Sequence, residues 1–241
     1  MFVAGTSACF VDLPLDAAIQ NLCDLEFTNV EIAIHENGNQ LKPSKVHANF
    51  DKALERCRQT LRLTPIAYSV EIEASGDAYY QQFASICKLA KATKVVTIVV
   101  PAAELGTPFN GEVERLLKLV AIASLEGAVV AVKIQSGRVT QDPNTVVVLC
   151  ENVKGLGITL DPSHLIYGPH QGSNYDQILK YVCHVHLRDT TKDQLQVRVG
   201  QGDVEYGKLV SQLEKIHYNR ALTVDITSME GVDHSAELRK L

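Results

Sequence analysis

Short apolar runs alternate with amphipathic stretches along the whole chain. In the runs, apolar and polar or small side chains alternate with a period of two, as in a β-strand with one apolar face. In the intervening stretches, apolar residues recur at helical spacing. The predicted strands are 2–7, 29–36, 64–72, 94–101, 128–137, one within 155–168, one within 182–190, and 221–228. The predicted helices are 14–27, 43–63, 78–92, 111–127, 144–153, 174–181, 207–217 and 233–241.

Eight strands that alternate with helices predict an α/β fold with parallel strands, because parallel strands need crossover connections. The chain has 241 residues, and an eight-stranded β/α barrel needs roughly 200 to 250. No glycine-rich phosphate-binding sequence follows the first strand, which disfavours a doubly wound sheet. No linker or low-complexity segment divides the chain. We therefore predict one TIM-barrel domain, a (β/α)8 barrel, over residues 1–241.

Composition and charge restrict the partners. The net charge of −5 and the pI near 5.9 disfavour nucleic acid, whose phosphates attract basic surfaces. No apolar run approaches the ~20 residues that cross a bilayer. The six cysteines are scattered without a CxxC pair, which predicts a reduced, cytoplasmic protein. A small molecule is therefore the expected partner, and the sequence is compatible with a monomer or a homodimer.

The ionisable residues of the predicted strands gather on one face. Where one face of a strand is uniformly Val, Ile or Leu, we assign it to the helix layer, so that the other face points into the barrel. The side chains assigned to the interior are Glu31, His35, Lys133, Gln135, Asp161, His184, His186, Arg188 and Asp225. Many lie at the C-terminal ends of strands, where TIM-barrel active sites are found. His164 follows Asp161 by three residues, on the loop beyond the strand.

Carboxylates and imidazoles converge from three adjacent strands in this arrangement. Burying Asp161, His164, His186 and Asp225 costs several kcal/mol, by order of magnitude, unless they are paired or bind a cation. Such ligands suit Mn²⁺, Mg²⁺, Zn²⁺ or Co²⁺. We therefore predict Asp161, His186 and Asp225 as candidate metal ligands. His184 would sit one layer deeper in a hydrogen-bonded polar layer.

Four motifs occur in order in the second half of the chain: ITLDPSH at 158–164, HVHLRD at 184–189, VGQGDVEYGKL at 199–209 and LTVDI at 222–226. Together they resemble the xylose-isomerase-like barrel superfamily, which includes sugar isomerases, epimerases, inosose dehydratases and family 2 AP endonucleases. The resemblance implies a metal held by Glu, Asp, His and Glu from strands five to eight. The matching positions here are Lys133, Asp161, His186 and Asp225.

Lys133 departs from that pattern, because a cation stands where the family has a ligand glutamate. Asp225 is also one methylene shorter than the usual Glu. Either Lys133 replaces the metal and pairs with Asp161 and Asp225, or a metal survives on Asp161, His186 and Asp225 with help from His164 or Gln135. A divalent ion and an ammonium repel each other in one cage, so we expect a weakly bound or absent metal.

The leading functional hypothesis is a sugar or polyol isomerase or epimerase, or a dehydratase, that works through an enediol-like intermediate. The resemblance implies catalytic roles for three residues: Asp225 as base, Lys133 or a metal as stabiliser of the oxyanion, and His164 as proton donor or hydroxyl anchor. Substrate oxygens would be held by the loop at 200–202 and by side chains of the mouth. The candidate substrate-binding residues are Glu31, His35, Gln135, Arg188 and Arg198.

Two other functions remain open. A non-catalytic sugar-binding or regulatory barrel would keep the pocket without the acid/base pair, and Lys133 is consistent with that loss. An AP endonuclease is disfavoured. Gln194-Leu195-Gln196 stands where those enzymes have an Asp-x-His pair, and the chain is acidic.

Overall fold

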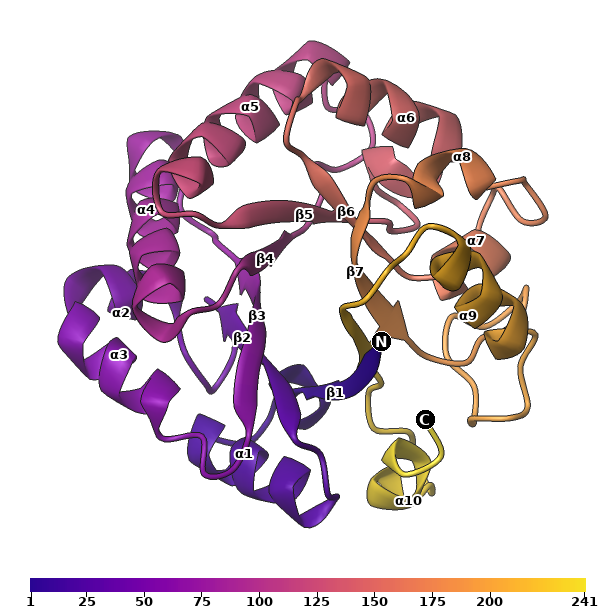
Figure 1. Cartoon of the computed structure of the whole chain (residues 1–241), viewed down its shortest axis with the longest axis horizontal. Coiled ribbons are helices and arrows are strands. Elements are labelled where there is room, and N and C mark those ends of the chain that lie inside the picture. The colour runs from indigo at the N-terminus through magenta and orange to yellow at the C-terminus, as the bar shows by residue number, and fades with distance from the viewer.

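The eight strands close into a parallel barrel (Figure 1). The computed structural model describes all 241 residues. Each strand pairs in parallel with the next along the chain, and β1 closes the ring on β8. The strands are β1 Phe2–Thr6, β2 Asn29–His35, β3 Thr64–Glu71, β4 Thr97–Val100, β5 Val129–Lys133, β6 Gly157–Leu160, β7 Val182–Leu187 and β8 Ala221–Val224. The predicted eight-stranded TIM barrel is confirmed.

Helices surround the barrel (Figure 1). They are α1 Leu15–Asp24, α2 Pro43–Ala48, α3 Phe50–Arg58, α4 Gly76–Thr93, α5 Phe109–Leu125, α6 Pro143–Asn152, α7 Ser163–Ile166, α8 Asp176–Leu179, α9 Tyr206–Lys215 and α10 His234–Leu238. Two 3₁₀ turns, Ser7–Phe10 and Val139–Gln141, complete the chain. None of these helices combines the length and the apolar character needed to cross a membrane.

The predicted helix 43–63 is wrong in one respect, because it is two helices. Asn49 lies between α2 and α3, and its side chain accepts a hydrogen bond from the backbone N–H of Lys52. Asparagine is a preferred N-cap, so it begins a new helix instead of continuing the old one. The apolar periodicity runs through this break and does not reveal it.

The main core lies between the sheet and the helices and contains 45 buried residues. It includes Val30, Ile32 and Ile34, the apolar face predicted for β2. One face assignment is wrong. With His184 and His186 assigned to the interior, period two places Cys183 on the outer face of its strand. Its side chain packs instead with Val99 and Ala131, on the side of the sheet that also carries Lys133. The pairing register of β6 and β7 shifts between Ile158 and Thr159, and period two fails at such an irregularity.

Candidate active site

Asp161 lies directly after β6 and is completely buried. The helix α7 begins two residues later, and the backbone N–H of Ser163 donates to Oδ1 of Asp161 at 3.1 Å. The hydroxyl of Ser163 donates to the same oxygen. Burial raises the pKa of this carboxyl, but Arg188 and His164 outweigh burial and hold the pKa below its usual value. Asp161 is therefore a fixed anion.

Asp225, directly after β8, is surrounded by three basic side chains. Its Oδ2 lies 2.8 Å from Nη2 of Arg188, 3.1 Å from Nδ1 of His186 and 3.6 Å from Nζ of Lys133. Burial raises the pKa of the carboxyl, but Lys133, Arg188 and His186 together hold it well below its ordinary value. Asp225 is consequently ionised and a weak base in this arrangement.

Arg188 joins the two carboxylates. Its Nε lies 3.2 Å from Oδ2 of Asp161, while Nη2 donates to Asp225. Only 11% of the side chain is exposed, and no protein acceptor takes a hydrogen bond from Nη1. The predicted ion pair of Lys133 with Asp225 is present, but the predicted pair of Lys133 with Asp161 is not. Arg188 is the cation that contacts Asp161.

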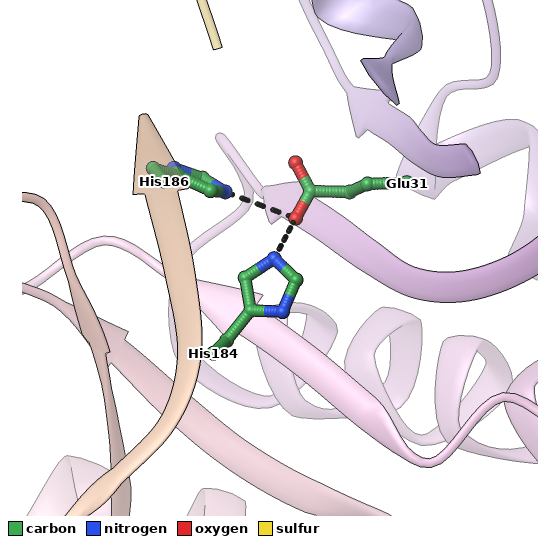
Figure 2. A group of neighbouring side chains, drawn as sticks. All are labelled: Glu31, His184 and His186. Carbon is green, nitrogen blue, oxygen red and sulfur yellow. Dashed lines mark hydrogen bonds and ion pairs between the residues drawn. The ribbon is translucent and has the colours of Figure 1, made fainter. Parts of the chain in front are cut away.

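A second charged group lies deeper in the barrel, where Glu31 of β2 meets two histidines of β7 (Figure 2). One oxygen, Oε2 of Glu31, lies 2.8 Å from Nε2 of His184 and 3.0 Å from Nε2 of His186. His184 also contacts the hydroxyl of Thr223 at 3.2 Å. All of these side chains are buried. Glu31 is enclosed by the two imidazoles, and its predicted contact with substrate stays a prediction. His184 lies in a hydrogen-bonded polar group inside the barrel.

The two imidazoles differ in charge. Burial disfavours the imidazolium of His186, but Glu31 and Asp225 outweigh burial and raise its pKa to about 9. Burial dominates at His184 and lowers its pKa, although Glu31 opposes the shift. For Glu31, burial raises the pKa, but His186 and His184 lower it well below its usual range. At neutral pH the group is therefore an ion pair of Glu31 and His186 beside a neutral His184.

His164 and Gln135 face the same mouth. Nδ1 of His164 accepts the backbone N–H of Ser136 at 3.1 Å, so the neutral ring carries its proton on Nε2. Burial lowers the pKa of His164, and Nε2 lies 3.7 Å from Oδ2 of Asp161. Oε1 of Gln135 is buried without a hydrogen-bond partner. His164 can therefore donate a hydrogen bond to a substrate oxygen, and Gln135 can accept one.

His35 ends β2, and its side chain is 17% exposed. Its Nε2 lies 3.2 Å from the hydroxyl of Ser69 on β3. Burial lowers the pKa of His35, with Glu71 opposing the shift, so the imidazole is neutral at pH 7. The predicted role of His35 in substrate binding stays a prediction.

The loop at 200–202 is held from inside the protein. Its N–H groups, from Gly200 and Gly202, donate to Oδ2 of Asp189 at 2.7 and 3.0 Å. A side chain at Gly202 would overlap this carboxylate. Arg198 is half exposed and lies 3.4 Å from Glu237 of α10. These N–H groups and the guanidinium of Arg198 therefore hold the loop, and their predicted role in substrate binding stays a prediction.

Comparison with known proteins gives the family. A family model described as the xylose isomerase-like TIM barrel matches residues 19–240. The chain belongs to this family. None of the curated proteins matches the sequence.

Solved structures share the fold of this xylose isomerase-like barrel at low identity. They include 3-keto-D-glucoside 4-epimerase, YcjR, from E. coli (TM-score 0.73, 16% identity, 100% of this chain and 97% of that one). The IOLI protein with a bound zinc atom has a TM-score of 0.73 and 17% identity, over 100% and 95% of the two chains. A xylose isomerase-like TIM barrel protein from Mycobacterium smegmatis in complex with magnesium has a TM-score of 0.78 and 14% identity, over 99% and 94%.

The four positions at which the family resemblance places a metal do not fit one in this chain. Lys133 brings an ammonium to the site, and the guanidinium of Arg188 already contacts both Asp161 and Asp225. Cationic side chains cannot be ligands for a metal ion, since neither offers a lone pair while charged. The carboxylates that would bind a metal at the mouth are therefore already paired with cationic side chains of the protein.

The deeper group has the composition of a metal site. The nearest ligand atoms of Glu31, His184 and His186 all lie within 4.8 Å of one another, and the three residues are buried. One carboxylate and two imidazoles suit zinc and similar divalent ions. This group could hold a divalent metal. Sequence reasoning missed it because β8 and β1 separate β7 from β2 around the barrel.

Proposed function

We propose that this barrel binds a sugar or polyol at its mouth and catalyses isomerase- or epimerase-like proton transfer through an enediol-type intermediate, with a degenerate metal site. The observation that supports this proposal most strongly is a pair of cationic side chains, Lys133 and Arg188. Both contact Asp225, and both keep N–H groups free to donate hydrogen bonds to a substrate. Nζ of Lys133 is 3.6 Å from Asp225, and Nη1 of Arg188 has no protein acceptor. The sugar epimerase among the similar structures supports the substrate class.

In this proposal the two cations stabilise the oxyanion of the enediolate. The lysine and arginine side chains are only 15% and 11% exposed, and charge interactions strengthen where water is excluded. His164 donates its Nε2 hydrogen to a substrate hydroxyl, and Gln135 accepts from another. His35 provides a further polar contact on the opposite flank.

The carbon-bound proton needs a base, and Asp225 is the proposed one. Its low pKa makes it a weak base while Lys133, Arg188 and His186 surround it. A substrate oxygen that draws Lys133 away would raise its basicity. The low pKa of Asp225 also favours a second candidate function, a sugar-binding barrel without turnover, in which Asp225 stays paired with its cations.

Turnover of ketoses and inososes in D₂O, followed by NMR for exchange of carbon-bound hydrogen, separates these candidates. We expect exchange by the wild type, and a roughly 100-fold loss of kcat/KM in Lys133→Met, as when an oxyanion donor is removed. Lys91→Met is the matched control, since Lys91 is 64% exposed and pairs with Glu126 on the outer helices. Binding by calorimetry without exchange would support the second candidate. Binding of an abasic-site duplex in preference to every sugar would contradict both.

A further inference from the structure

The place between Asp161 and Asp225 is filled by a side chain of this chain. Arg188, which follows β7, contacts Oδ2 of Asp161 through Nε and Oδ2 of Asp225 through Nη2. These two carboxylates stand at family metal positions from strands six and eight. One guanidinium thus spans the two carboxylates that a metal would have to share.

The charges at the mouth balance without a metal. Two carboxylates, Asp161 and Asp225, face the two basic side chains of Arg188 and Lys133, while His186 pairs with Glu31. A divalent ion at the same place would add two positive charges to a neutral set in a region from which water is largely excluded. Opposite charges in low dielectric attract strongly, and like charges repel equally strongly.

Arginine is also a cation that cannot leave by losing a proton. A metal would have to push the guanidinium out of both ion pairs. No other carboxylate lies within ion-pair distance of Arg188 to receive it.

We infer that Arg188 is the resident cation of this mouth: its guanidinium holds Asp161 and Asp225 in the place of the family's metal, and Lys133 occupies the fourth ligand position. Arg188 is a positioning residue for Asp225 as well as a donor to substrate. This inference rests on the same site as the proposed function. Metal content tests the role of Arg188 without any substrate, so the inference and the proposed function can fail independently.

Metal bound per chain, measured by mass spectrometry after loading with Mn²⁺ or Zn²⁺ and gel filtration, tests the inference. Asp161→Asn is expected to leave the metal content of the wild type unchanged, because the mouth holds none. Lys133→Glu/Arg188→Met removes both cations and restores the carboxylate. It is expected to gain one equivalent of metal and a Tm that rises with Mn²⁺, and adding Asp161→Asn should abolish both gains.

Two single variants at the mouth and one variant of the deeper group, Glu31→Gln, show where any bound metal lies. Lys133→Glu keeps one of the two cations and Arg188→Lys keeps a cation at both positions, so we expect each variant to bind metal at least tenfold more weakly than the double variant. If the wild type binds metal and Glu31→Gln loses it while Asp161→Asn keeps it, the metal lies on the deeper group. That result would agree with Arg188 as the cation of the mouth. Wild-type metal lost in Asp161→Asn would overturn the inference. So would a folded double variant that gains no metal. The wild-type comparison holds even if the double variant does not fold.

Discussion

Arg188→Met is expected to lower the free energy of unfolding by about 3–5 kcal/mol, because it leaves buried carboxylates without their cation. Asp161 is completely buried, and the other basic side chain within ion-pair distance is His164 at 3.7 Å, whose imidazole is neutral because burial lowers its pKa. Methionine keeps the apolar stem of the side chain and removes the guanidinium, so packing of the stem is largely retained. Urea denaturation followed by far-UV circular dichroism measures the change.

Arg198→Met is the matched control for that substitution. Arg198 also contacts one carboxylate, but its side chain is 52% exposed, and exposed pairs contribute about 0–1 kcal/mol. Combining Arg188→Met with Asp161→Asn should recover part of the loss, since the buried anion is gone. Equal unfolding free energies for Arg188→Met and wild type would contradict the account of the mouth.

Glu31→Gln is expected to lower the free energy of unfolding at neutral pH by about 3–5 kcal/mol, because His186 loses a buried counterion. The wild type should also depend on pH. The pKa of His186 is raised from 6.5 to about 9 in the folded state. Its contribution to stability is therefore fully present below pH 6.5 and is lost as the pH rises to 9. The shift corresponds to roughly 3 kcal/mol.

Unfolding in urea at pH 6.5 and pH 9 measures this contribution. Glu31 and Asp225 both face His186 and raise its pKa, while Lys133 opposes them. Glu31→Gln removes one of the two carboxylates, so its stability should fall less across this interval than that of the wild type. Glu71→Gln is the control, because Glu71 is 53% exposed and 3.9 Å from His35. A parallel pH dependence in Glu31→Gln and wild type would show that Glu31 does not hold the His186 proton.

The barrel could be predicted from the sequence because two periodicities alternate eight times. The same face assignment brought Asp161, His186 and Asp225 to one end of the barrel, and the structure places the last two 3.1 Å apart. The pattern is informative here because each strand has one continuous apolar face. It fails where that regularity fails, at Cys183 beside the register shift and at Asn49 between two helices.

The contacts inside the barrel could not be predicted in the same way. Period two states which face a side chain occupies, but not how strands separated around the ring are staggered along the axis. That stagger brings Glu31 level with His184 and His186, and it sets Arg188 level with Asp161 and Asp225. Arg188 was assigned to substrate because its face was known and its neighbours were not. Lys133 breaks the family pattern in the sequence, yet Arg188 lies closer to the carboxylates of the mouth than Lys133 does.

Anomalous diffraction from crystals soaked in Mn²⁺ tests the central claim most directly, since the claim is that the mouth carries its own cation. We predict no anomalous peak between Asp161 and Asp225, and density for the guanidinium of Arg188 bridging them. A manganese peak bonded to Asp161, His186 and Asp225, with Arg188 turned away from both carboxylates, would contradict the account.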